Sequence, residues 1–331
     1  MAGLFKKKYV ENQPGQNLPV VTVPGKIVFQ SNRGGSLSEI YVLENGQMRK
    51  IASDEKTTVD LPKGLPAIFG NALAGMKKPK WSPDGLQILC GSSDEENAIL
   101  DANGQVLTKF KPQKSAYEVA WDPRGEGVYF TEKDKDLKGG GSFNIYYMNI
   151  ETEEERRITN LPPLPGIRHI LSLAISPDNQ KIAFNMVDEN TSIWLINTDG
   201  TDLKRLVKIA SDPAWSPDGK KLVYTSEFDP TGQAKIAQYS ELFVLDLDTM
   251  QTDRITNNQW EDRFPVFSPE GKQIAFKSAR HNVDFVQGAE LFVINIDGTG
   301  EARLTPPQRN SKYPPDSING WATDEYPDWH A

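Results

Sequence analysis

The sequence predicts an all-β protein, a six-bladed β-propeller with four antiparallel strands in each blade. Two observations predict this fold. A hairpin built on a Ser-Pro-Asp-Gly turn recurs at a period of roughly 40 to 50 residues, and most copies are followed by two further strands. Four antiparallel strands at such a period are typical of one propeller blade, and the two chain ends supply strands that close the ring.

The clearest hairpin spans residues 213–225, with the sequence PAWSPDGKKLVYT. A short apolar strand leads into its turn, and a β-branched and aromatic strand follows. Pro217 presets φ for the second position of a type I turn, Asp218 suits the third, and Gly219 takes the left-handed position after it. Related turns lie at residues 82–85, 122–125, 176–179 and 268–271.

Most hairpins continue into a third strand and a short fourth strand. Third strands are expected at residues 39–43, 144–148, 192–196, 241–245 and 290–294. The fourth strands carry Arg-Ile-Thr or Arg-Leu-Thr, at residues 157–159, 254–256 and 303–305. Each repeat therefore supplies the four strands of a blade.

The chain ends are expected to share the sixth blade. The inner strands anchored on Trp81, Trp121, Ile175, Trp215 and Phe267 account for five blades. The chain enters at a second strand near Lys26 and finishes with an inner strand at residues 326–331, so pairing the two ends removes the open sheet edges. Residues 1–25 are expected to form an extended lead-in, and residues 26–331 a single propeller domain.

The repeat pattern PxWSPDGxxIxF followed by EIYVxNxDGTxxRRLT resembles the Pro-Asp, WD40-like repeats of TolB-type β-propellers, over about residues 26–331. In that family the channel mouth receives a partner polypeptide, so the resemblance implies a protein or peptide partner. TolB proteins also carry an α/β domain ahead of the propeller. Residues 1–25 are too few for it, and its role is therefore not carried over.

Composition narrows the classes of partner. The chain has 37 Lys and Arg against 45 Asp and Glu, a formal net charge of −8, which argues against nucleic acid or an anionic membrane. No apolar run approaches the length of a membrane helix, so membrane insertion is not expected.

Cys90 has no cysteine to pair with and is expected to be buried. We expect a soluble monomer, cytoplasmic as written, or periplasmic or secreted if a leader was trimmed.

Strand alternation places the tight turns on one face of the propeller and the long loops on the other. Binding residues usually lie on loops that a rigid scaffold holds in place. The residues before each inner strand, with one aromatic side chain of the last loop, are expected at the channel mouth: Lys77, Lys78, Tyr117, Glu118, Arg168, His169, Asp212, Asp262, Arg263, Trp321 and Tyr326. This mixed-charge ring could bind a polar group, or its charges could neutralise one another.

No catalytic set is recognisable. The three histidines, His169, His281 and His330, are not expected to converge on a metal ion, and neither a GxSxG elbow nor a P-loop lysine is present, so no metal or cofactor is expected. The first hypothesis is a non-catalytic propeller that binds a protein, peptide or other ligand at the mouth. The alternative is a carbohydrate-active hydrolase or lyase, because Glu118, Asp212 and Asp262 could face one another there.

Overall fold

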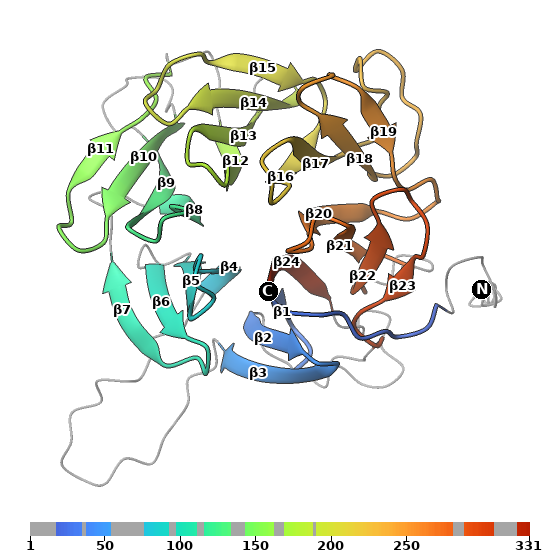
Figure 1. The fold of residues 1–331 in the computed structure, drawn as a ribbon, viewed down its shortest axis with the longest axis horizontal. Coiled ribbons are helices and arrows are strands. Elements are labelled where there is room, and N and C mark those ends of the chain that lie inside the picture. Colours follow the sequence, from blue (N-terminus) through green and yellow to red (C-terminus); the bar gives the residue numbers. More distant parts are fainter. Residues whose placement is uncertain are drawn as a thin grey trace, which may run out of the picture.

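Each sequence repeat forms one four-stranded antiparallel sheet, and six such sheets surround a central axis in the computed structural model (Figure 1). The structure describes residues 18–34, 38–53, 76–92, 97–110, 116–133, 143–161, 169–187, 190–280, 288–307 and 323–331. All 24 elements within these ranges are strands, so the predicted six-bladed propeller is confirmed. Across the same ranges no helix is long and apolar enough to span a bilayer.

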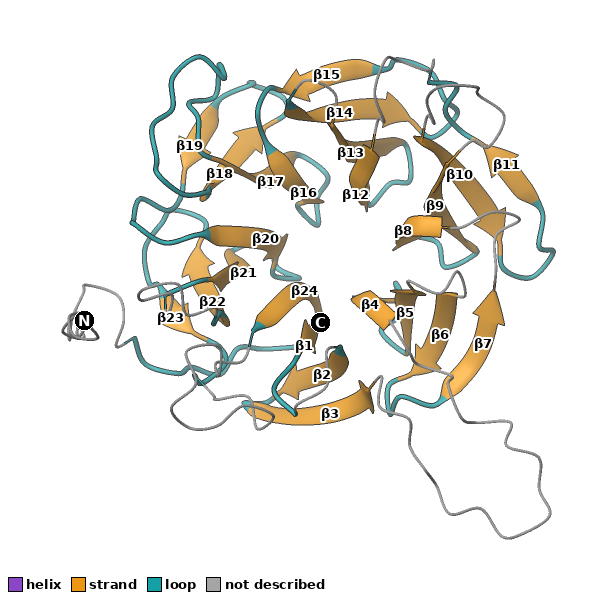
Figure 2. Ribbon diagram, turned by 180° about the vertical axis from the view of Figure 1, so that it is seen from behind, coloured by secondary structure: helices purple, strands orange, loops and turns teal. Residues whose placement is uncertain are grey.

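Four concentric rings of strands build the propeller (Figure 2). The innermost strands are β4 (Met76–Trp81), β8 (Ala116–Trp121), β12 (His169–Ile175), β16 (Ser211–Trp215), β20 (Asp262–Phe267) and β24 (Asp324–His330). The second strands are β5 (Gln87–Ser92), β9 (Gly127–Lys133), β13 (Lys181–Val187), β17 (Lys221–Ser226), β21 (Gln273–Ser278) and β1 (Lys26–Ser31). The third strands are β6 (Asn97–Asp101), β10 (Phe143–Asn149), β14 (Thr191–Asn197), β18 (Glu241–Asp246), β22 (Glu290–Asn295) and β2 (Glu39–Glu44). The outermost strands are β7 (Val106–Phe110), β11 (Glu155–Arg157), β15 (Lys204–Val207), β19 (Thr252–Arg254), β23 (Ala302–Arg303) and β3 (Gln47–Ser53).

The two chain ends close the ring. Strand β24 pairs antiparallel with β1, placing Trp329 opposite Ile27. The Trp329 side chain is 7% exposed, and its indole Nε1 donates to the carbonyl oxygen of Pro24 at 2.9 Å. The predicted closure by a C-terminal strand is therefore confirmed, and the shared sheet has the order β24, β1, β2, β3.

Residues 18–24 form a strap along the blade that precedes the closure. The Val21 backbone N–H donates to Arg303 O at 2.8 Å, and Arg303 N–H donates to Pro19 O at 2.9 Å, so the strap runs parallel to β23. Val23 is buried in the apolar cluster that also holds Phe29 and Leu291. The strap therefore contacts both blades that meet at the closure.

The repeated turns use the chemistry that the sequence predicts. Ser216 Oγ donates to Asp218 Oδ1 at 2.6 Å and accepts from Lys221 N–H at 2.8 Å, while Gly219 has a φ of +70°. The hydrogen bond from Ser216 lowers the pKa of the Asp218 carboxyl group. The same Ser-to-Asp bond recurs between residues 82 and 84 and between residues 176 and 178. These turns define the tight-turn face.

Apolar clusters between adjacent blades form the core. Phe29 packs in one cluster with Ala275 and Leu291 of the neighbouring sheet. Tryptophan side chains form hydrogen bonds between successive inner strands. Trp121 Nε1 donates to Lys80 O at 3.2 Å, and Trp215 Nε1 donates to Ala174 O at 3.0 Å. Cys90 is fully buried, as expected, and burial raises the pKa of its thiol to about 12.

Candidate functional site

Each inner strand carries a β-bulge near its first residue. In all six sheets the register between the inner and second strands shifts there by an added residue. Counting three positions back from each anchor residue gives one residue per blade: Lys78, Glu118, Ser172, Asp212, Phe264 and Tyr326. Bulges re-aim side chains and are common next to binding sites. The six bulges therefore mark one level of the central channel.

Four of these bulges have the same unusual backbone. Lys78, Asp212, Phe264 and Tyr326 have φ values of +52°, +55°, +53° and +52°, and each is followed by proline. A left-handed conformation in a residue other than glycine costs roughly 1 kcal/mol or more. Proline has no N–H to donate, which suits a position where the ladder is already interrupted. The repeated motif thus holds four side chains in the same backbone setting.

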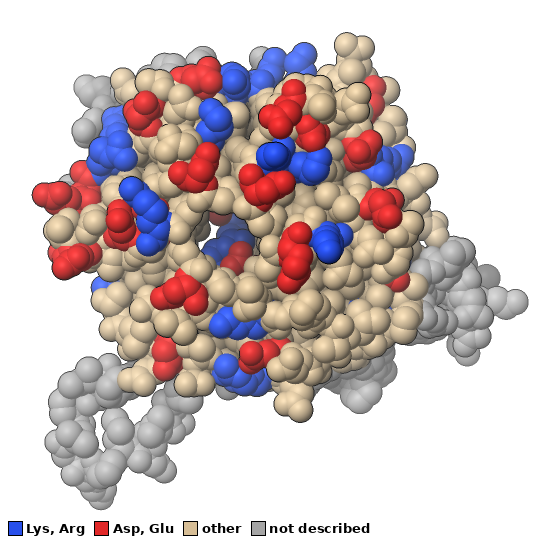
Figure 3. Space-filling model, in the orientation of Figure 1, with Lys and Arg blue, Asp and Glu red and all other residues tan. Residues whose placement is uncertain are grey.

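The bulges enclose a cavity at the long-loop end of the channel, which we call the mouth cavity. Its volume is about 80 Å³, and its lining includes Lys78, Lys80, Glu118, Leu171, Asp212, Phe264 and Tyr326. One water needs roughly 15 Å³ on this measure, so the cavity has room for the end of a side chain. A view along the axis shows the central opening with charged side chains of both signs inside it (Figure 3).

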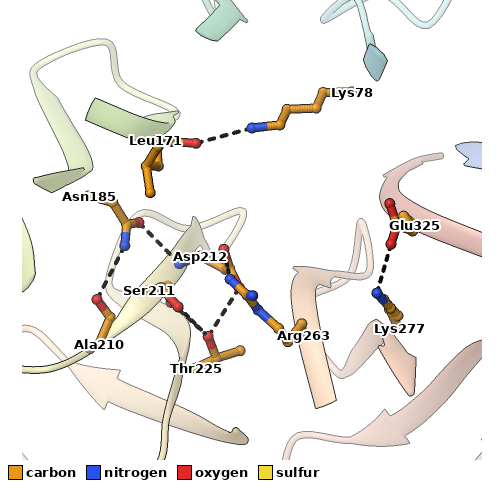
Figure 4. Close-up of polar contacts among 10 residues, drawn as sticks. All are labelled: Lys78, Leu171, Asn185, Ala210, Ser211, Asp212, Thr225, Arg263, Lys277 and Glu325. Atoms are coloured by element: carbon orange, nitrogen blue, oxygen red, sulfur yellow. Dashed lines mark hydrogen bonds and ion pairs between the residues drawn. The ribbon is translucent and has the colours of Figure 1, made fainter. Parts of the chain in front are cut away.

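One wall of the mouth cavity is a charged pair that spans three blades. Lys78 Nζ of β4 forms a short ion pair with Glu118 of β8. The same Nζ donates to Leu171 O of β12 at 3.1 Å (Figure 4). The Lys78 side chain is 28% exposed and the Glu118 side chain 11%. Burial raises the pKa of Glu118 to about 7, although the Lys78 ammonium acts to lower it. Near neutral pH, Glu118 is therefore partly protonated.

A second charged pair lies on the adjacent blades. Arg263 Nε donates to Asp212 Oδ2 at 2.9 Å, and Thr225 Oγ1 donates to the same oxygen at 3.1 Å (Figure 4). The Asp212 backbone N–H donates to Asn185 Oδ1 at 3.0 Å. Asp212 is thus held in place and neutralised by groups of its own and neighbouring strands.

The opposite wall is aromatic. The rings of Phe264 and Tyr326 lie 4.2 Å apart between centroids, with an interplanar angle of 38°. Lys78 Nζ lies 5.2 Å from the Tyr326 ring centroid, within the range of a cation–π contact. Burial raises the pKa of the Tyr326 phenol above its ordinary value, so the ring remains neutral. The mouth cavity therefore combines a flat apolar wall with a wall of charged groups.

Comparisons of sequence and of structure both find TolB proteins similar to this chain. No family model matches the chain. The Tol-Pal system protein TolB of Francisella tularensis is 27% identical over 233 residues, covering 66% of this chain and 48% of that protein. The crystal structure of TolB from Acinetobacter baumannii has a TM-score of 0.65 at 19% identity, covering 92% of this chain and 66% of that one. The chain is a TolB-like six-bladed propeller.

This TolB-like propeller also shares its fold with an enzyme. An oligogalacturonate lyase in complex with manganese has a TM-score of 0.57 at 14% identity, covering 89% of this chain and 77% of that one. Among the residues that the structure describes, no three His, Cys, Asp or Glu side chains are grouped closely enough to hold a metal ion. The chain spans at most about half the length of the curated relatives it matches.

The structure brings together part of the predicted mouth. Lys78, Glu118, Asp212 and Tyr326 line the mouth cavity, and Arg263 pairs with Asp212. Arg168 and Trp321 lie outside the described residues, as do the side chains of Lys77, Tyr117 and His169.

The predicted place of Asp262 at the mouth is corrected by the structure. Its side chain is fully buried inside its blade and accepts hydrogen bonds from Ser278 Oγ at 2.6 Å and Asn258 Nδ2 at 2.8 Å. Asp324 takes the equivalent position in the closing blade and accepts from Ser31 Oγ at 2.7 Å. Asp262 therefore belongs to a buried network that holds the start of the strand.

Four residues that line the mouth cavity were not predicted from the sequence: Lys80, Leu171, Ser172 and Phe264. A signal for two of them was present. Phe264 precedes Pro265, as Lys78, Asp212 and Tyr326 precede their prolines, and Ser172 lies three residues before its anchor, Ile175. Counting back from the anchors, instead of forward from the expected start of each strand, finds both.

Proposed function

We propose that this TolB-like propeller is a binding module that holds a polypeptide partner at the mouth cavity. The observation that carries the proposal is the convergence of six bulged strands on one small cavity with an aromatic wall. Rigid aromatic side chains at the centre of a contact surface are the usual anchors of protein binding. Similarity to TolB of Francisella tularensis, which is named as a Tol-Pal system protein, supports a protein partner.

The size of the mouth cavity favours a peptide over a bulkier ligand. About 80 Å³ admits one side chain or chain end, and the rest of the partner lies outside the cavity. Leu171 is 46% exposed while lining the cavity, which leaves an apolar contact at the rim. The mixed charges of Lys78, Glu118, Asp212 and Arg263 suit the polar backbone and charged groups of a peptide.

Blocking the rim tests this function. The immobilised chain is used to select binders from a random peptide display library, and the enriched peptides are measured against Leu171→Arg. We expect at least a tenfold loss of affinity, because a long cationic side chain then occupies the mouth. The matched control is Leu107→Arg, since Leu107 is 50% exposed on the outermost strand β7. Equal binding by both variants contradicts the proposal.

A second candidate, a carbohydrate-active hydrolase or lyase, is favoured by one observation. The Glu118 carboxyl group has a pKa of about 7 and is influenced by the charge of Asp212, an arrangement suited to acid–base chemistry. A screen of neutral and uronate-containing glycans tests it. Turnover that is lost in Glu118→Gln would establish the enzyme, whereas no turnover of any glycan removes this candidate.

A further inference from the structure

The charged groups that line the mouth cavity form pairs of opposite sign. Lys78 and Lys80 both line it, and so do the carboxylates of Glu118 and Asp212. Asp212 is engaged by Arg263 and Thr225, whereas Lys78 pairs with Glu118 and Lys80 with Asp328. A ligand carboxylate therefore reaches these lysines by exchange with their present partners.

The partners of the two lysines are exchangeable. Lys78 reaches Glu118 and one backbone carbonyl oxygen, and its side chain remains 28% exposed. Lys80 lies 3.4 Å from Asp328 Oδ1, which is longer than an ordinary charged hydrogen bond, and its side chain is 33% exposed. Asp328 Oδ2 already accepts from the Trp81 backbone N–H at 2.7 Å. Lys80 can thus turn to a ligand while Asp328 keeps its backbone hydrogen bond, whereas Lys78 can do so only if the buried Glu118 carboxylate is neutralised.

We propose that the mouth cavity recognises a carboxylate of the polypeptide partner, which replaces Glu118 beside Lys78 and is also contacted by Lys80. This inference rests on the function proposed above and names the chemical group that the site selects. The carboxylate belongs to an acidic side chain or to the C-terminus of the partner. The aromatic wall of Phe264 and Tyr326 then contacts the apolar part of the same residue.

Exchange of partners on Lys78 links binding to a proton. Once the ligand carboxylate holds Lys78, Glu118 is a buried acid beside a second negative charge, and it takes up a proton. The groups facing Glu118 are Lys78 and Lys80 of β4, Asp212 of β16 and Tyr326 of β24. The described cavity-lining side chains of β12, Leu171 to Leu173, carry no charge. Because burial already raises the pKa of Glu118 to about 7, affinity should increase as the pH falls through that value.

Three short peptides of equal length test the inference by calorimetry. All contain Phe beside the variable residue: one has an internal Glu with both termini blocked, one has Gln with both termini blocked, and one has Gln with a free C-terminus. We expect one of the two carboxylate peptides to bind about tenfold or more tightly than the blocked Gln peptide. Which of the two does so identifies the source of the carboxylate. Its affinity should rise about tenfold or more from about pH 8.5 to about pH 6, with net proton uptake.

Variants separate recognition from proton coupling. Lys78→Gln should abolish the preference for a carboxylate, while Glu118→Gln should keep the preference and lose the pH dependence. Lys204→Gln is the control, since Lys204 forms an exposed ion pair with Asp202 on the outer strand β15. A failure of both carboxylate peptides to bind, or an unchanged preference in Lys78→Gln, overturns the inference. If library-selected peptides still lose affinity in Leu171→Arg, the proposed function survives that failure.

Discussion

Burial affects two carboxyl groups of this protein in the same direction but in different surroundings. It raises the pKa of Glu118 and of Asp262 to about 7 in each case. Glu118 opens onto the mouth cavity and pairs with Lys78, whereas Asp262 is fully buried among Ser278 and Asn258. A similarly raised pKa is therefore found in a candidate binding group, Glu118, and in a structural hydrogen-bond network, that of Asp262.

The raised pKa of Glu118 predicts a pH-dependent stability. Its pKa is 4.5 in the unfolded chain and about 7 in the native state, so between these values the native state binds more protons. The stability it contributes is complete below about pH 4.5 and is lost as the pH rises through about 7. We expect Glu118→Gln to reduce the drop in melting temperature between about pH 5 and pH 8 by about 2 to 5 °C.

Thermal unfolding followed by circular dichroism at both pH values measures this drop. Glu151→Gln, at an exposed turn position, is the control and should leave the drop unchanged. An identical drop in the parent and Glu118→Gln would show that Glu118 is not the group that titrates.

Hairpins and bulges differ in how far local sequence determines them. The turn at Ser216 depends on contacts within six residues, among Ser216, Asp218 and Lys221. A bulge depends on the register between two strands, and a shift of one residue sends a side chain to the opposite face of the sheet. The hairpins could therefore be predicted from sequence, whereas the bulges that build the mouth cavity became visible only in the structure.

The Ser-to-Asp bond of the turn has a measurable effect on stability. Ser216→Ala removes a hydroxyl that donates to Asp218 and accepts from Lys221 N–H, and should lower the free energy of unfolding by about 1 to 2 kcal/mol. Ser268 is the matched control, because it accepts from Gln273 N–H at 3.1 Å in a turn that has Glu270 in place of Asp. Urea unfolding should show a smaller loss for Ser268→Ala. Equal losses would assign no stabilisation to the carboxylate.

The same contrast explains which mouth residues were predictable. Lys78, Asp212 and Tyr326 each lie directly before the proline of an inner strand, so their approximate place followed from the repeat. Asp262 lies before the register shift at Phe264, which interrupts the alternation of side chains, and its side chain is buried inside the blade instead of in the channel. Lys78 reaches Leu171 of a blade two positions away in the ring, a contact that no local pattern encodes.

At the scale of the whole molecule, closure joins residues nearly 300 positions apart. Strand β24 fills the inner place of a blade that begins at Lys26, and the strap of residues 18–24 covers the junction. Both chain ends were predictable because each carried an incomplete blade. Closure pairs the inner edge of β1, which would otherwise be free to pair with another chain.

Loosening the closure should cause association. Trp329→Ala and Trp121→Ala both remove a similarly buried indole that is hydrogen-bonded to a neighbouring backbone carbonyl group, and each should lower the free energy of unfolding by about 3 to 5 kcal/mol. Trp329→Ala also weakens the pairing of β1 with β24, its inner neighbour in the sheet. Light scattering after size exclusion should therefore detect oligomers for Trp329→Ala alone. Monomers for both variants would show that the ring remains shut.

The direction of the last strand determines from which face of the propeller a tether joined to the C-terminus leaves. From Tyr326 at the mouth, β24 runs to the tight-turn face, where His330 Nε2 lies 3.0 Å from the carbonyl oxygen of Pro83. A tether or fusion joined to Ala331 leaves from that far side. A resin or sensor chip coupled there would present the peptide-accepting end outward, whereas coupling through the long loops would hide it.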